Sequence, residues 1–288
     1  MAAFRGSEPT SPIRSSGPCA DQPAIPALAD LVLAVGGFVI AASKEEYVEV
    51  APSAARTSMS PALHNARAFF GRRKGHKLRP RQAGLFTTLL PRLAIDVARP
   101  APAELSSLFA EPVAALALEI GFGGGEAMIA QAKAHPQIGF LGVEPFVNGM
   151  AKALAAIEAE GLRNIRLHFG DAVGLIEWLP ASSLVRIDLI HPDPWPKRRH
   201  WKRRFVQDEM VEQLARILQH AGEFRFVSDI PDYAAWTLQR LMRSSRFEWT
   251  ANCADDWRNP WPGFTATRYH AKAARERRTS CFLVFRKI

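Results

Sequence analysis

The 288-residue sequence is poor in cysteine, with three residues of this type. Cys19, Cys253 and Cys281 are far apart and odd in number, so they indicate neither a disulfide framework nor a CxxC zinc site. No other His/Cys/Asp spacing is typical of a metal site, and we expect no metal. A reducing, cytoplasmic compartment is the expectation that follows.

Acidic residues are also in deficit. The chain has 28 Asp and Glu against 37 Lys and Arg, which gives a formal net charge of +9. This balance favours an acidic partner, either nucleic acid or an anionic membrane surface. Long apolar runs are lacking too, because Leu31–Ala42 spans only 12 residues and a membrane helix needs roughly 20. Since 48% of the residues are hydrophobic, the chain can still bury a sizeable core.

Composition divides the chain into three parts. Residues 1–62 are rich in Ala, Pro and Ser, which predicts a disordered or accessory extension. Residues 63–110 form a basic arm and an N-terminal helix region, and 111–288 the main domain. Within the arm, Phe69–Phe86 has two open interpretations of equal weight: a solvated leader to a helix, or a segment that closes over a polyanionic substrate.

Short apolar runs alternate with helical patterns along the main domain. This alternation predicts an α/β fold with a doubly wound, mostly parallel, seven-stranded Rossmann-like sheet. The expected strands are Leu116–Gly121, Gly139–Glu144, Asn164–Ala172, Val185–His191, Glu223–Asp229, and closing strands in "RFEWT" and "SCFLVFRK". The expected helices are Gly124–His135, Val147–Gly161, Arg204–Gly222 and Pro231–Arg243.

Acidic residues follow the predicted strands, at Glu144, Asp171, Asp193 and Asp229. In parallel sheets, ligands bind beyond the carboxyl ends of the strands. Each of these residues alone could equally be a helix N-cap, worth about 1 kcal/mol. Because several occur in phase beside a glycine loop, we predict a nucleoside site.

The glycine loop "LEIGFGGGE" departs from the dinucleotide fingerprint G-x-G-x-x-G. Gly121 and Gly123 occupy the first two glycine positions, but the third is Glu126, an anion that opposes a pyrophosphate. This loop suits a ligand that carries positive charge and no phosphate, such as S-adenosylmethionine. We expect Glu119 to help neutralise the ligand's cations and Glu144 to accept hydrogen bonds from its ribose hydroxyls. Asp171 can accept one from the adenine amino group.

The stretch "HPDPWPKRRHWKRR", His191–Arg204, sets one carboxylate beside six Lys and Arg. Prolines around Asp193 most often mark an ordinary turn, and a basic run is usually a solvated face. Trp195 is as well suited to packing against the fold as to stacking on RNA. The position of the run beside a predicted active site, with an aromatic residue inside it, favours RNA contact.

Together these stretches resemble the tRNA (guanine-N7)-methyltransferase family, from about Phe69 to the C-terminus. "LEIGFGGGE", "GVEP", "GDA", "HPDPWPKRRHWKRR", "SDIPDY" and "TRYH" carry the resemblance. It implies a fold in which 111–288 is an S-adenosylmethionine-dependent methyltransferase domain. It also implies methyl transfer to N7 of a guanosine in the variable loop of tRNA, which yields 7-methylguanosine.

The resemblance implies a set of site residues. It makes Asp193 the active-site residue and places around the cofactor Glu119, Gly121, Gly123, Glu144, Asp171 and Asp193. The residues that it places against the substrate or the RNA are Lys197, Arg199, His200, Trp201, Lys202, Arg203, Arg204, Asp229, Thr267, Arg268, Tyr269 and His270. Two positions depart from the family pattern: His191 stands where the family has Phe, and His270 where it commonly has Glu.

Two alternatives stay open at this stage. A methyltransferase acting on an exocyclic adenine amine or a protein amide would carry an Asn/Asp-Pro-Pro-aromatic turn at the same place. A non-catalytic RNA-binding scaffold would keep the fold without cofactor binding. The expected partner is tRNA, with neither a membrane nor an obligatory protein partner, and the sequence does not decide between monomer and homodimer.

Overall fold

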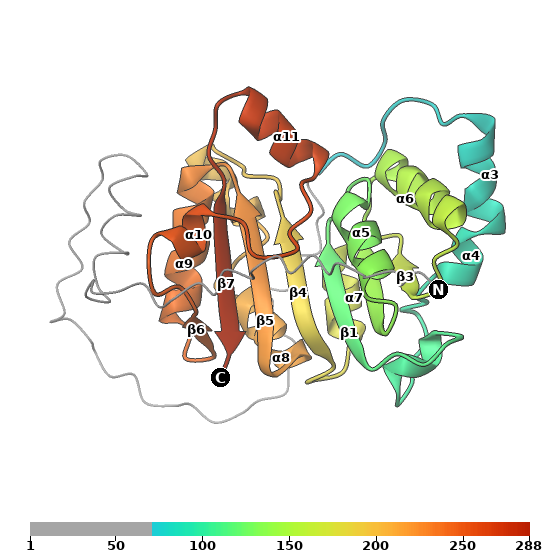
Figure 1. Ribbon diagram of the computed structural model, residues 1–288, viewed down its shortest axis with the longest axis horizontal. Helices are drawn as coiled ribbons and strands as arrows, with labels where there is room; N and C mark the ends of the chain where they lie inside the picture. The colour runs from blue at the N-terminus through green and yellow to red at the C-terminus, as the bar shows by residue number, and fades with distance from the viewer. Residues whose placement is uncertain (1–70) are drawn as a thin grey trace, which may run out of the picture.

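The computed structural model describes residues 71–288 and contains a seven-stranded sheet between two layers of helices (Figure 1). The strand order is β3-β2-β1-β4-β5-β7-β6. Neighbouring strands from β3 to β5 are parallel, whereas β7 runs antiparallel to both β5 and β6. The strands are β1 (Ala115–Ile120), β2 (Ile138–Val143), β3 (Ile165–His168), β4 (Leu184–Ile190), β5 (Leu218–Ser228), β6 (Phe247–Trp249) and β7 (Cys281–Lys287). The predicted fold class is confirmed.

Helices cover both faces of the sheet because each strand alternates apolar side chains between them. On one face, Ala117 and Phe140 pack with α3 (Pro80–Thr88), α4 (Leu90–Leu93), α5 (Glu126–Ala134) and α6 (Val147–Glu160). On the other face, Leu118 and Ile187 pack with α7 (Ala172–Trp178), α8 (Asp208–Ile217) and α9 (Pro231–Arg243). The remaining short elements are η1 (Leu105–Leu108), η2 (Arg198–Arg203), α10 (Asp255–Arg258) and α11 (Arg268–Arg275).

The helix predicted over Arg204–Gly222 is shorter than expected. It comprises only α8, because Leu218 starts β5 and pairs with Leu184 across the sheet. The ladder shifts register beyond that pair, and Ala221 takes a left-handed φ of 61°. Burial of Leu218 in the sheet therefore overrides a helical pattern that continues through the residue.

Because β3, β2, β1, β4 and β5 are parallel, the predicted ligand-binding residues that follow them lie at the same end of the sheet, and Figure 1 shows α11 above the ends of β4 and β5. Within 71–288, no helix is both long and apolar enough to cross a membrane. The extension predicted for 1–62 lies outside the described residues.

Candidate active site

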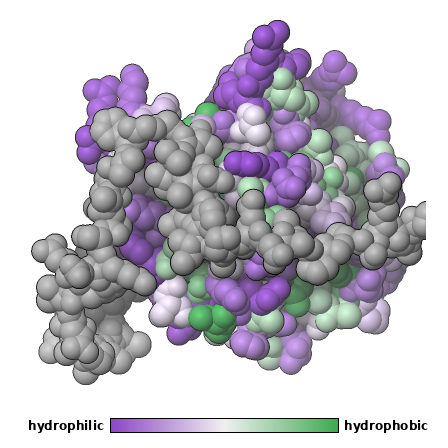
Figure 2. Space-filling view, turned by 60° about the vertical axis from the view of Figure 1, so that its left-hand side comes forward, coloured by the Kyte–Doolittle hydropathy of each residue, from purple (hydrophilic) through white to green (hydrophobic). Residues whose placement is uncertain are grey.

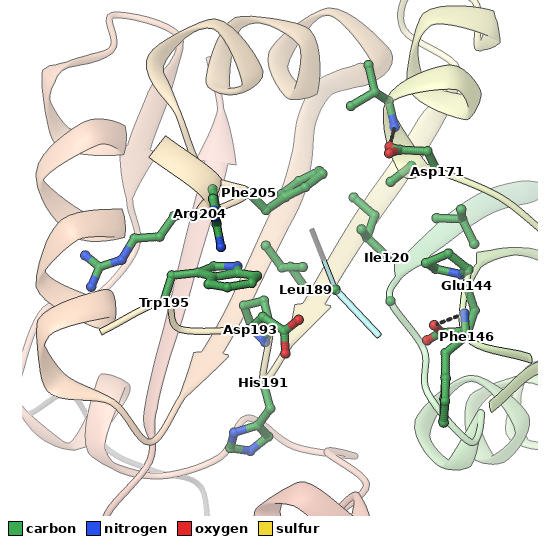
Figure 3. A pocket seen from close by; sticks show the side chains of 18 of the residues that line it. Ile120, Glu144, Phe146, Asp171, Leu189, His191, Asp193, Trp195, Arg204 and Phe205 are labelled. Carbon is green, nitrogen blue, oxygen red and sulfur yellow. Dashed lines mark hydrogen bonds between the residues drawn. The ribbon is translucent and has the colours of Figure 1, made fainter. Parts of the chain in front are cut away.

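A cavity of about 870 Å³ opens at the carboxyl ends of β1, β2 and β4. Its volume is in the range of cofactor and small-molecule sites. Apolar side chains form its floor, among them Ile120, Val143 and Leu189. Carboxylates stand around that floor, and Figure 3 shows Asp193 and Glu144 on opposite sides of it.

The glycine loop forms one wall and has a backbone that only glycine adopts without strain. Gly121, Gly123 and Gly125 have φ of 67°, 57° and 80°. A Cβ at Gly121 would meet no atom within 4 Å, so the backbone here faces open space. The loop can therefore approach a ligand without a side chain between them.

Glu144, at the end of β2, is buried and fixed by two backbone hydrogen bonds. Its Oε2 accepts from Gly123 N at 2.6 Å and its Oε1 from Phe146 N at 2.8 Å. Burial raises the pKa of Glu144, although both backbone bonds favour the ionised form. Each oxygen keeps a second lone pair, so the carboxylate can still accept from a pair of hydroxyl groups.

Gly149 on α6 allows the helix to reach the glycine loop. A Cβ at this position would lie 2.4 Å from the carbonyl oxygen of Gly123. The sequence analysis did not single out this glycine, because a glycine within a helical pattern carries no mark of its packing partner.

Asp171 caps a helix and also borders the cavity, so its predicted contact with the cofactor stays a prediction. It is the N-cap of α7, where its Oδ1 accepts from Val173 N at 2.9 Å, and it also lines the cavity (Figure 3). Burial raises the pKa of Asp171. One oxygen is thus committed to the helix, which leaves the other for a ligand.

Asp193 lies in a turn whose flanking residues have unusual backbone conformations. His191 and Trp195 have φ of 50° and 45°, which non-glycine residues rarely adopt. Such conformations cost roughly 1–3 kcal/mol each and persist where the surroundings impose them. The Asp193 side chain is open to the cavity, yet desolvation by the surrounding protein raises its pKa. The turn thus presents a carboxylate at a defined place.

Glu119 does not line this cavity. Strand alternation turns it to the other face of β1, into a small pocket of about 20 Å³ closed by Trp261–Thr265. Burial, together with Asp188 on β4, raises the pKa of Glu119 well above its ordinary range. Its cofactor contact stays a prediction, and in the structure its carboxyl group shares this second pocket with Asp188 and Arg186.

The basic run separates into exposed and buried members. The exposed members are Lys197, Arg198, Arg199 and Lys202. The partly exposed members are His200, Trp201 and Arg203. The rim at which the parallel strands end is rich in hydrophilic side chains, as the upper part of Figure 2 shows. Two of the predicted RNA contacts have partners within the fold. Arg204 is only 1% exposed, and the Trp201 ring packs edge-on against Trp236 with centroids 5.4 Å apart. Their contacts with RNA stay predictions.

Asp229 also stands back from the cavity. Its carboxylate accepts from Arg278 Nε at 2.6 Å and contacts His191 Nδ1 at 3.2 Å. Burial opposes ionisation of Asp229, but these two bonds leave its pKa below the ordinary value. An ionised carboxylate only accepts, so Nδ1 of His191 carries the proton. The predicted substrate contact of Asp229 stays a prediction.

The stretch predicted at Thr267–His270 forms the start of α11 and divides in the same way. Arg268 and Tyr269 line the cavity and lie beside Gly123. Thr267 is buried and caps the helix, with its hydroxyl accepting from His270 N at 3.3 Å. His270 turns its ring towards Phe264, Phe282 and His191.

The basic arm before α3 is fixed to the cavity wall by Asn148. Gly75 N donates to Asn148 Oδ1 at 2.8 Å, and Asn148 Nδ2 donates to the carbonyl of His76 at 2.7 Å. Arg72 thereby lines the cavity and lies over Phe146 at 5.9 Å. This placement favours the second interpretation of the arm. Asn148 was missed because its partners are more than 70 residues away.

Comparisons with known proteins agree with this geometry. A family described as "Putative methyltransferase" matches residues 113–283. A tRNA (guanine-N(7)-)-methyltransferase of Rhodopseudomonas palustris (strain BisB5) is 62% identical over 230 residues, which cover 80% of this chain and 90% of that protein. One of Nitrobacter hamburgensis is 58% identical over 236 residues, with 82% and 92% covered. The chain belongs to the tRNA (guanine-N7)-methyltransferase family.

The cofactor of this family, S-adenosylmethionine, fits the residues present. The open backbone at Gly121 leaves room for a ligand, and Glu144, Asp171 and Asp193 supply acceptors for hydroxyl, amino and ammonium groups. These carboxylates can offset the positive charge of the sulfonium and ammonium groups of S-adenosylmethionine.

Proposed function

We propose that the chain transfers a methyl group from S-adenosylmethionine to N7 of a guanosine in the variable loop of tRNA, forming 7-methylguanosine. The observation that supports it most directly is the Asp193 carboxylate, presented by a turn between two left-handed residues at a cavity with a cationic rim. The names of the relatives support the reaction, and the exposed cations of η2 support a polyanionic substrate.

The residues suit a reaction that needs no strong base. Guanine N7 presents a lone pair on the major-groove edge, and no proton leaves before it attacks. When bound, S-adenosylmethionine supplies the methyl group as an electrophilic sulfonium substituent. Glu144 and Asp171 bind and orient the nucleoside part. Asp193 accepts from N1–H and the exocyclic amine of guanine, which orients N7 and stabilises the positive charge that develops on the purine.

The phosphates of the tRNA face the exposed cations of η2, while Arg268 and Tyr269 border the cavity beside Gly123. These two groups would hold the loop so that a base turned out of its stack enters the cavity. Lys197, Arg199 and Lys202 are the proposed phosphate contacts, since they are exposed members of the run.

The test is nucleoside mass spectrometry of tRNA incubated with the protein and S-adenosylmethionine, with the modified fragment mapped after ribonuclease digestion. We expect 7-methylguanosine in the variable loop, abolished by Asp193→Asn and unchanged by Asp96→Asn, which alters an exposed carboxylate outside the cavity. N6-methyladenosine in place of 7-methylguanosine would overturn the proposal. Wild-type yield from Asp193→Asn would remove only the role of Asp193.

A further inference from the structure

Arg204, the last residue of the basic run, is enclosed by aromatic rings. Its guanidinium carbon lies 4.9 Å from the ring centroid of Trp201 and 5.0 Å from those of Tyr233 and Trp236. The side chain has no exposed surface. A cation in such a place needs both the faces of the rings and hydrogen-bond acceptors for its five N–H groups.

The acceptors come from two separate segments. Arg204 Nε donates to the carbonyl of Pro194 at 3.0 Å, which belongs to the residue directly after Asp193. The Nη groups donate to the carbonyl and the carboxylate of Asp232, in the first turn of α9. One planar group therefore connects the turn that carries Asp193 to α9, a helix that packs against the sheet.

Arg204 makes this connection at a turn whose backbone conformation is strained. The turn contains the left-handed residues His191 and Trp195, a conformation that relaxes unless neighbouring structure holds it. The near side is fixed by His191 N, which donates to Val227 O at 2.8 Å. On the far side, the bond from Arg204 holds the carbonyl of Pro194 between Asp193 and Trp195.

We propose that Arg204 is a positioning residue for methyl transfer. The aromatic rings and Asp232 fix its guanidinium, and the guanidinium in turn holds the turn that carries Asp193. The inference rests on the proposed function of Asp193. Its geometry requires arginine, because lysine has a single ammonium on a flexible stem and does not match a planar fork between Pro194 and Asp232.

The chain offers a matched control in Arg240. Its guanidinium stacks on the same Trp236 ring, at 3.2 Å from the centroid, and pairs with Asp208 at 3.5 Å. Its partners are the Trp236 ring and Asp208 rather than the Asp193 turn, and it lies outside the cavity lining. Arg204→Lys and Arg240→Lys are thus the same chemical change on one aromatic ring, with and without a bond to the turn.

The experiment measures kcat, the KM for tRNA, the Kd for S-adenosylmethionine, thermal unfolding and the pH dependence of kcat in both variants. We expect Arg204→Lys to lower kcat by about 10- to 100-fold while KM and Kd stay within about three-fold, and Arg240→Lys to keep wild-type kcat. Since desolvation raises the pKa of Asp193, a released turn should also move the acid limb of the kcat profile to lower pH.

Asp232→Asn gives the answer if Arg204→Lys does not fold. Asp232 is half exposed, and the variant removes only the charge of one anchor, so a smaller fall in kcat of the same kind is expected. Unchanged kcat in a folded Arg204→Lys, or an equal loss in Arg240→Lys, would overturn the inference. A rise in the KM for tRNA at constant kcat would do so as well, because it indicates RNA contact. If Asp193→Asn is fully active, the proposed role of Asp193 has failed instead.

Discussion

The imidazole rings of His191 and His270 lie 5.8 Å apart, centroid to centroid. These are the two positions at which the chain departs from the usual Phe and Glu of its family. The departures are therefore neighbours in space, although 79 residues separate them in the sequence. Arg278 reaches the same pair through Asp229, which also contacts the buried imidazole of His191.

His191 should make the stability of the fold depend on pH. Burial lowers its pKa, an effect that Asp229 opposes and that His270 and Arg278 strengthen. With a folded pKa below the unfolded value, the unfolded chain binds the proton first, so stability falls as pH drops below about 6.5. His191→Phe removes this term, and its melting temperature should fall less than that of the wild type between about pH 7.5 and 5.5.

The control for this titration is His220→Phe, which replaces an exposed histidine on β5 and should leave the wild-type slope unchanged. Calorimetric melting at several pH values provides the measurement. Equal slopes for His191→Phe and the wild type would show that His191 does not titrate differently in the two states.

Glu119 should have the opposite dependence. Burial and Asp188 raise its pKa, so the folded state holds the proton longer than the unfolded chain does. Stability is then highest below the unfolded pKa and falls as pH rises towards the folded pKa, by about 1.4 kcal/mol per unit. Glu119→Gln should be more stable than the wild type at neutral pH, with the difference vanishing near pH 4. Urea unfolding of both proteins without cofactor at several pH values measures this difference in the free energy of unfolding. A difference that does not change with pH would contradict the prediction.

Much of the central sheet could be predicted because buried parallel strands are short apolar runs that end in glycine or acid. β1 and β2 were placed within one residue, since "LALEIG" and "GFLGVE" are short apolar runs that end in glycine or an acid. The helix predicted over Arg204–Gly222 was too long at both ends, since α8 spans Asp208–Ile217. Local periodicity does not reveal that Leu218 pairs with Leu184 or that Arg204 is buried between helices.

The site was less predictable where side-chain direction decides the outcome. The order Glu119-Ile120-Gly121 identifies the loop, but strand alternation sends Ile120 to the cavity and Glu119 to the other face. In the basic run, six similar cations give no pattern that marks the buried one. Its partners Tyr233 and Trp236 lie about 30 residues further on. The left-handed turn residues, being neither Gly nor Asn, also carry no signal.

The exposed and buried cations should differ in their effect on RNA binding. Lys202 is exposed at the cavity, so Lys202→Ala should weaken tRNA binding and reduce the salt slope by about 0.7–0.9 for one lost phosphate contact. Arg204→Lys should leave that slope unchanged, since its side chain has no exposed surface. Lys133→Ala, on α5 and paired with Glu160, is the control for a general loss of positive charge. Fluorescence titrations with tRNA over a series of salt concentrations measure these slopes. A wild-type slope in Lys202→Ala would exclude Lys202 from the interface.

Gly149 and Gly174 should respond to the same substitution with opposite signs. Alanine normally favours a helix over glycine by about 0.5–1 kcal/mol, and Gly174→Ala on α7 meets no atom within 4 Å. That variant should therefore melt at a higher temperature.

In Gly149→Ala the new Cβ meets the carbonyl oxygen of Gly123 at 2.4 Å, so α6 or the glycine loop must move. Overpacking of this kind costs about 1–3 kcal/mol, which exceeds the gain in helix propensity. Because the displaced loop also holds Glu144 through Gly123 N, affinity for S-adenosylmethionine should fall as well. Melting temperatures and calorimetric cofactor binding test both effects, and a Gly149→Ala variant that matches Gly174→Ala in either would show that α6 does not brace the loop.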